Sequence, residues 1–329
     1  MRGFQSDNAA GIHPEVMAAL TAEASRSRES DAVLRWQQVV ESRFGSSASS
    51  VIVSNGTGAN VVGLSAMLPF GGVVLTPASA HIHRSEAGAV DKVGGLKIVP
   101  VPSPSGKLTP QSLDRFWPLV GHTPAAVSVS QSTEFGTTYS AHELRDLSRW
   151  AHDRGLLVHM DGARLPHAAA AHGASLRALS ADCGVDVLSL GGTKHGALAA
   201  EAVVSLGSIS VSALARVQRS FMQEPPKARF AAAQMISLFE GGLWRETAHQ
   251  ANAMAMRLRQ GLEGIADTQF AQPTECNAVI VQLSPEALAR VSERFAVNPR
   301  SAVPGFTRLM TSWDTTEEDV DALVSIVHG

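Results

Sequence analysis

The feature of this sequence that most limits its possible folds is a regular alternation of short apolar runs with longer segments of helical period. Six apolar runs, set off by Gly, Ser and Pro, lie at residues 50–54, 72–76, 125–130, 156–160, 185–190 and 202–206. Apolar runs of this length that alternate with helical segments are typical of strands joined by crossover helices. The pattern predicts an α/β fold with a mostly parallel sheet flanked by helices.

Two helical segments carry recognisable boundary signals. A helix is expected at 142–154, where Ser140 and Glu143 have the spacing of a capping box. Another is expected at 229–265, with a break at Gly241-Gly242, because two glycines interrupt a helical pattern.

The pattern of the chain changes after about residue 250. A long amphipathic helix leads to scattered strands such as 277–283, and a terminal helix begins at Thr315-Thr-Glu-Glu318. A chain of 329 residues is also longer than a single core usually supports. We therefore expect a large domain at 15–245 and a smaller α/β domain at 246–329.

Composition narrows the class of protein. A formal net charge of −3 leaves no basic excess for nucleic acid, so we do not expect a nucleic-acid partner. The chain shows neither an apolar signal core near Met1 nor a run long enough to span a bilayer, so we expect a cytoplasmic protein without membrane contact. Cys183 and Cys276 are far apart, which predicts no disulfide framework, no zinc site and two inert, partly buried thiols.

Polar residues follow three of the apolar runs directly. Parallel sheets bind ligands beyond the carboxyl ends of their strands, so these positions are candidates for a functional site. They are Asn55-Gly-Thr-Gly-Ala-Asn60, Asp161-Gly-Ala-Arg164 and Gly191-Gly-Thr-Lys194.

Asp161 and Lys194 suit the chemistry of pyridoxal phosphate (PLP). A carboxylate beside the pyridine nitrogen keeps the ring protonated, and a lysine amine forms an imine with the aldehyde. The alternative is a structural salt bridge between the two residues, although a buried pair with no further use is costly to desolvate.

The segment that starts at Asn55 is a candidate for binding a phosphate. The backbone N–H groups of Asn55-Gly-Thr-Gly58 and the Thr57 hydroxyl would lie at a helix N-terminus, which favours anions. An ordinary tight turn is the alternative. The segment matches neither a P-loop nor a GxGxxG fingerprint, so ATP and NAD are not favoured.

His81 and His83 follow another apolar run, in His81-Ile-His-Arg-Ser-Glu86. An imidazole can lie flat on an aromatic cofactor or move protons near neutral pH. Metal binding and plain surface positions are the alternatives, and we expect His83 to lie at the surface.

Seven sequence blocks follow one another in order over nearly the whole chain: Phe4-Gln-Ser-Asp-Asn-Ala-Ala-Gly-Ile-His-Pro14, Asn55-Gly-Thr-Gly-Ala-Asn60, His81-Ile-x-x-x-Glu86, Gln131-Ser-Thr-Glu134, His159-Met-Asp-Gly-Ala-Arg-Leu165, Ser189-Leu-Gly-Gly-Thr-Lys-His-Gly196 and Arg308-Leu-Met-Thr-Ser-Trp313. Taken together, they resemble the low-specificity L-threonine aldolases. The DGARL and GGTKxG blocks are the most specific, and the region 283–304 is the least.

The resemblance implies a PLP-dependent enzyme of fold type I that works as a homotetramer or homodimer with shared active sites. Its expected catalytic residues are Lys194 as the imine lysine, Asp161 as the partner of the pyridine nitrogen, and His81 stacked on the ring. Gly56 and Thr57 would hold the phosphate.

The resemblance also implies an amino-acid substrate. Arg164, Arg308 and Ser6 would bind its carboxylate, with Arg164 also contacting the cofactor, and the N-terminal segment 1–14 would contribute to the active site. A turn cap for Ser6 and a surface ion pair for Arg308 are the alternatives. The expected reaction cleaves L-threonine, L-allo-threonine or a related β-hydroxy-α-amino acid to glycine and an aldehyde. Alternatives on the same fold are a β-eliminating lyase, a transaldolase and a PLP-binding protein that has lost turnover.

The chain departs from the family pattern at two places. Ser27-Arg-Glu-Ser-Asp31 stands where relatives carry a Tyr-Gly-x-Asp loop, and the single tyrosine, Tyr139, lies elsewhere in the sequence. Glu134 stands where some relatives have a histidine. The missing tyrosine bears on substrate preference and catalytic rate more than on cofactor binding. The group that takes the β-hydroxyl proton stays open among His81, His83, Glu134 and a water held by the phosphate.

Overall fold

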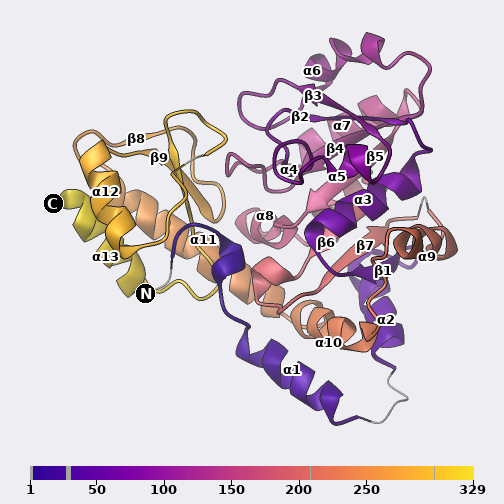
Figure 1. Cartoon of the computed structure of the whole chain (residues 1–329), viewed down its shortest axis with the longest axis horizontal. Coiled ribbons are helices and arrows are strands. Elements are labelled where there is room, and N and C mark those ends of the chain that lie inside the picture. Colours follow the sequence, from indigo (N-terminus) through magenta and orange to yellow (C-terminus); the bar gives the residue numbers. More distant parts are fainter. Residues whose placement is uncertain (1–2, 27–30, 208, 300) are drawn as a thin grey trace.

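The computed structural model describes residues 3–26, 31–207, 209–299 and 301–329 of the chain. Two sheets organise the described residues (Figure 1). The larger has seven strands in the order β1-β7-β6-β5-β4-β2-β3, and the smaller has three in the order β10-β9-β8. Their bounds are β1 Ser49–Val53, β2 Val73–Pro77, β3 Lys97–Val101, β4 Ala125–Ser130, β5 Leu157–Gly162, β6 Val187–Gly191, β7 Glu201–Ser205, β8 Gln269–Phe270, β9 Ala278–Gln282 and β10 Thr307–Met310.

The larger sheet confirms the predicted α/β fold. Parallel pairing runs from β3 through β2, β4 and β5 to β6, whereas β7 lies antiparallel to both β6 and β1. The six predicted runs become β1, β2, β4, β5, β6 and β7, with small shifts at their ends. The sequence did not reveal β3, which is partly exposed at the sheet edge and contains Pro100. An edge strand tolerates a proline that would end a central one.

Helices surround the larger sheet, and two predicted boundaries are confirmed. Ser140 caps α7 through a capping box with Glu143, and the expected long helix divides at Gly241-Gly242 into α10 and α11. The α-helices are α1 Pro14–Ala24, α2 Ala32–Phe44, α3 Gly56–Met67, α4 His81–Arg84, α5 Ala89–Lys92, α6 Pro110–Asp114, α7 Ala141–His152, α8 Leu165–Ala171, α9 Val211–Ser220, α10 Ala228–Phe239, α11 Leu243–Leu262, α12 Pro285–Arg294 and α13 Glu317–His328. Short 3₁₀ turns include η1 Asp7–Ala9 and η5 Thr193–His195.

The N-terminal segment connects the two sheets. Phe4 is buried in the core of the smaller sheet, where its carbonyl accepts a bond from Met310 N–H at 2.8 Å. A few residues later, His13 N–H donates to the carbonyl of Gly196 at 2.9 Å, beside the end of β6. The chain between these anchors therefore passes over the carboxyl edge of the larger sheet. No described helix has both the length and the apolar character needed to cross a membrane.

Candidate active site

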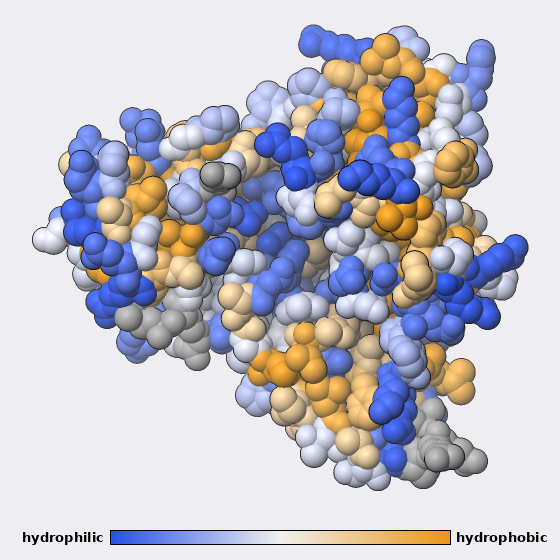
Figure 2. Space-filling model, in the orientation of Figure 1, coloured by the Kyte–Doolittle hydropathy of each residue, from blue (hydrophilic) through white to orange (hydrophobic). Residues whose placement is uncertain are grey.

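A polar cavity lies at the carboxyl end of the central strands. Its volume is about 290 Å³, and its walls come from the start of α3, the end of β5 and the turn after β6. A second cavity of about 410 Å³ adjoins it and shares five residues with it: Asn8, His81, Glu134, Arg164 and Lys194. Figure 2 shows this face hollowed between the parts of the chain that carry the two sheets, with hydrophilic side chains at the centre.

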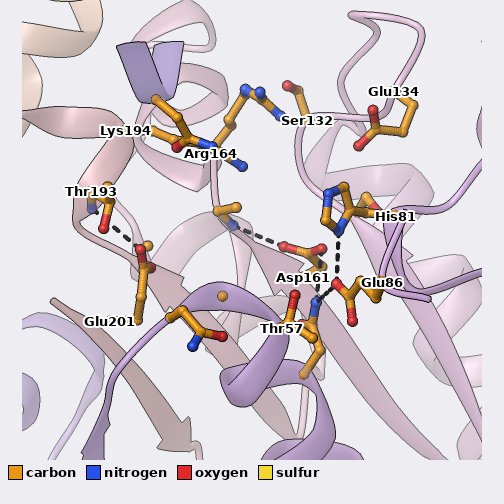
Figure 3. Close-up of a pocket in the computed structure, with 17 residues that line it drawn as sticks. Thr57, His81, Glu86, Ser132, Glu134, Asp161, Arg164, Thr193, Lys194 and Glu201 are labelled. Atoms are coloured by element: carbon orange, nitrogen blue, oxygen red, sulfur yellow. Dashed lines mark hydrogen bonds and ion pairs between the residues drawn. The ribbon is translucent and has the colours of Figure 1, made fainter. Parts of the chain in front are cut away.

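Lys194 enters the cavity from η5, directly after β6 (Figure 3). The two glycines before it allow a tight approach of backbone segments, because a Cβ on Gly191 would lie 2.8 Å from the Ala163 carbonyl oxygen. Glu201 on β7 accepts hydrogen bonds from the N–H groups of Gly192 at 3.1 Å and Thr193 at 3.4 Å. Burial raises the pKa of this glutamate. The turn that presents Lys194 is thus tied to the neighbouring strand.

Asp161 belongs to a buried hydrogen-bond network on the cavity floor (Figure 3). The Asn60 amide donates to Asp161 Oδ2 at 3.3 Å and to Glu86 Oε1 at 2.8 Å, and Glu86 Oε1 also lies 2.7 Å from His81 Nδ1. Burial raises the pKa of Asp161, but the positive charges of Lys194 and His81 outweigh it and hold the pKa below its usual value. Asp161 is therefore a carboxylate that faces the cavity as an anion.

His81 is oriented by Glu86 from beneath. The hydrogen bond with Glu86 is the main cause that raises the pKa of His81, while burial opposes it. The Glu86 side chain is fully buried, and its Oε2 has no hydrogen-bond partner among the described residues. His83 on the same short helix is exposed and lines neither cavity, which agrees with the surface position expected for it.

The first turn of α3 forms a cradle for an anion. Asn55 caps the helix by accepting from Gly58 N–H at 2.8 Å, and Gly56 and Thr57, whose amides take no part in this cap, line the cavity. A Cβ built on Gly56 would meet no atom within 4 Å, so open space lies next to this backbone. Together with the anionic Asp161 and the amine of Lys194, this donor set fits PLP: N–H groups for a phosphate, a carboxylate for a pyridinium and an amine for the aldehyde.

Arg164 is held by a partner that the sequence did not reveal. Its Nε and Nη2 donate to the two carboxylate oxygens of Asp7 at 2.7 and 2.8 Å, and both side chains are almost fully buried. Burial raises the pKa of Asp7, but the charges of Arg164 and Lys194 outweigh burial and hold it far below its usual range. One edge of the Arg164 guanidinium is therefore taken, although the residue still lines both cavities.

Ser6 and Arg308 both line the second cavity. The Ser6 hydroxyl accepts from Asn8 N–H at 3.2 Å, so it is a turn cap, and it also lines the cavity wall. Arg308 on β10 donates from Nη1 to Glu134 Oε2 at 2.9 Å. This is an ion pair, as one alternative supposed, but the pair lies on the cavity wall rather than on the outer surface.

All eight residues that the sequence marked as site residues thus line one or both cavities. Asn60, Glu201 and Asp7 were not assigned roles, because a single sequence gives no sign of their long-range partners. Tyr139 lies in the core, where its hydroxyl accepts from Leu108 N–H at 2.7 Å. Ser27-Arg-Glu-Ser30, most of the altered loop, lies outside the described residues. Among the residues that the structure describes, no cluster of three or more His, Cys, Asp or Glu residues forms a metal site.

Comparison with known proteins identifies the class. Residues 3–285 match the family model of the beta-eliminating lyases, so the chain belongs to that family. It is 32% identical to the low specificity L-threonine aldolase of Pseudomonas aeruginosa, over 97% of this chain and 95% of that protein. This identity confirms the resemblance drawn from the sequence blocks.

Solved structures support the fold. A threonine aldolase from Leishmania major superposes with a TM-score of 0.90 at 24% identity, over 99% of this chain and 98% of that one. A structure of SPT with PLP gives a TM-score of 0.75 at 18% identity, covering 99% of this chain and 86% of that one.

Proposed function

We propose that this chain is a PLP-dependent aldolase that cleaves L-threonine, L-allo-threonine or a related β-hydroxy-α-amino acid to glycine and an aldehyde. The observation that carries the proposal is the convergence of Lys194, the anionic Asp161 and the Gly56-Thr57 helix start on one cavity. When bound, PLP supplies an electron sink for the electrons of the broken Cα–Cβ bond.

The chain's own residues hold and orient the reactants in this proposal. Asp161 would keep the pyridine nitrogen protonated, His81 would lie against the ring, and the amides of Gly56 and Thr57 would bind the phosphate. Lys194 would hold the cofactor, and its amine would be placed to move a proton at the substrate Cα. His81, Glu134 and a water remain candidates for removing the β-hydroxyl proton.

The substrate carboxylate is assigned to Arg308, with Ser6 and Arg164 nearby. Arg308 is the better candidate of the two arginines, because only Arg308 has its guanidinium held through a single bond. A guanidinium fork matches a carboxylate through two parallel bonds.

Product analysis tests the reaction. The purified protein with PLP should convert L-threonine to equal amounts of glycine and acetaldehyde without releasing ammonia. Ammonia with a 2-oxo acid would indicate β-elimination instead, and exchange between added aldehydes would indicate a transaldolase. Cofactor absorbance without turnover on several β-hydroxy amino acids would favour a PLP-binding protein.

We further propose a cytoplasmic homodimer or homotetramer with shared active sites, and domains at 15–245 and 246–329. Exposed apolar side chains on α1 and α2, namely Met17, Val33 and Leu34, support an association of subunits. Figure 2 shows apolar side chains gathered around α1 and α10 at the lower edge of the molecule. Separate apolar cores under the two sheets support the division into domains. Sedimentation of the purified protein tests the subunit count.

A further inference from the structure

Two arginine–carboxylate pairs lie at the cavities, and they are held in different ways. Asp7 binds Arg164 through two hydrogen bonds, with exposed side-chain fractions of 0% and 8%. Glu134 binds Arg308 through one bond, and 15% and 18% of these side chains remain exposed. The first pair occupies one full edge of its guanidinium, whereas the second uses a single bond and lies on the cavity wall within reach of a ligand.

Glu134 does not saturate Arg308. The Arg308 Nε is buried and has no hydrogen-bond partner among the described residues. Guanidinium groups prefer two parallel bonds to a carboxylate, and a single bond uses only part of this capacity. A free carboxylate that enters the cavity can therefore replace Glu134 with a better match in hydrogen bonds and the same charge.

The Glu134 carboxylate also has an alternative partner, His81, when it leaves Arg308. It lines both cavities, and Figure 3 shows its carboxylate beside His81, on the side of the ring away from Asp161. Its negative charge contributes to the raised pKa of His81, so the imidazole offers a second favourable partner. The backbone next to Glu134 is anchored where Thr133 N–H donates to Thr137 O at 2.9 Å, so we expect the exchange to occur by side-chain rotation.

We propose that Glu134 is an internal occupant of the substrate-carboxylate site, which the incoming amino acid displaces from Arg308. Every carboxylate ligand then binds less tightly than Arg308 alone would allow, because each must first break the Glu134 pair. The inference rests on the part of the proposed function that assigns Arg308 to the carboxylate. It does not depend on which bond of the substrate is broken.

Binding of glycine and methylamine to the holoenzyme tests this exchange. Both ligands carry the amine, but only glycine carries the carboxylate. Calorimetry should show that Glu134→Gln binds glycine about tenfold more tightly than the wild type, with methylamine affinity unchanged. Glu240→Gln removes the same charge from an ion pair with Arg35, outside both cavities, and should change neither affinity.

Two further variants control for poor folding and for the role of Arg308. Glu134→Ala should also tighten glycine binding, which keeps the test valid if the glutamine variant folds poorly. In an Arg308→Gln background, Glu134→Gln should no longer affect glycine. Unchanged or weaker glycine binding in both Glu134 variants would overturn the proposal, and so would an equal gain for methylamine. These binding measurements do not depend on turnover. If the wild type fails to cleave threonine but the Glu134 variants bind glycine more tightly, the proposed reaction is refuted and this inference stands.

Discussion

Replacing Asp7 with asparagine should destabilise the protein by about 3–5 kcal/mol, the typical cost of removing one partner from a buried ion pair. In the structure, Asp7 accepts two bonds from Arg164 and a third from the Asn277 amide at 3.1 Å. An asparagine offers one acceptor oxygen in place of two and turns an amide donor toward the guanidinium. Arg164 would therefore keep a buried positive charge without its counter-charge.

Urea unfolding of the apoprotein at pH 7 measures this loss without the contribution of cofactor binding to stability. Asp321→Asn is the matched control, because Asp321 binds Arg257 through two bonds of 2.8 Å in the same geometry, but on the surface. Surface pairs contribute little, so this variant should unfold close to the wild type. Equal midpoints for the two variants would refute the reasoning.

The pH dependence of the Asp7 effect has a definite sign. The folded pKa of Asp7 is held far below its unfolded value, so its contribution is fully present above the unfolded pKa. The difference between the wild type and Asp7→Asn should therefore stay constant from pH 5 to pH 8. It should shrink only as the pH falls below about 4, where the unfolded carboxyl takes up a proton.

Three more outcomes are expected. Burial lowers the pKa of His159 to about 4, between the hydroxyls of Ser128 and Ser189, so stability should fall by up to about 3 kcal/mol as the pH drops from about 6.5 to about 4, where only the unfolded imidazole gains a proton. His159→Gln should lose less stability over that range, and an unchanged slope would contradict the assignment. Gly56→Ala should leave the urea midpoint of the apoprotein unchanged but weaken PLP binding about tenfold, because its Cβ meets no protein atom and lies at the cradle. Equal PLP affinity in a titration would place the phosphate elsewhere. Glu86→Gln should lower the pKa of His81 in an NMR titration, since the Glu86 bond is the main cause of its rise, and an unshifted curve would mean that other charges set it.

The strands and their ends could be predicted from the sequence because they depend on local patterns. Runs of apolar residues gave β5 and β6, and the polar residues that follow them brought Asp161 and Lys194 to one cavity, as open parallel sheets require. The edge strand β3 was missed because Lys97 and Pro100 interrupt its apolar run. Local pattern thus reveals buried strands better than edge strands.

The partners of the site residues could not be predicted in the same way. Asp7 and Arg164 are separated by 157 positions, and Glu134 and Arg308 by 174. No periodicity in one sequence connects residues so far apart, and both pairs form only when the N-terminal segment and β10 fold against the larger sheet. The sequence therefore predicted which residues have suitable chemistry for the site, but not which neighbouring carboxylate each arginine binds.

Covalent trapping shows whether Lys194 carries PLP at the end of β6. Borohydride reduction of the purified holoenzyme should fix the cofactor to one lysine, and peptide mapping should place the label on Lys194. The Lys194→Ala variant should show no labelled peptide. A label on any other lysine, or no label in the wild type, would contradict this assignment.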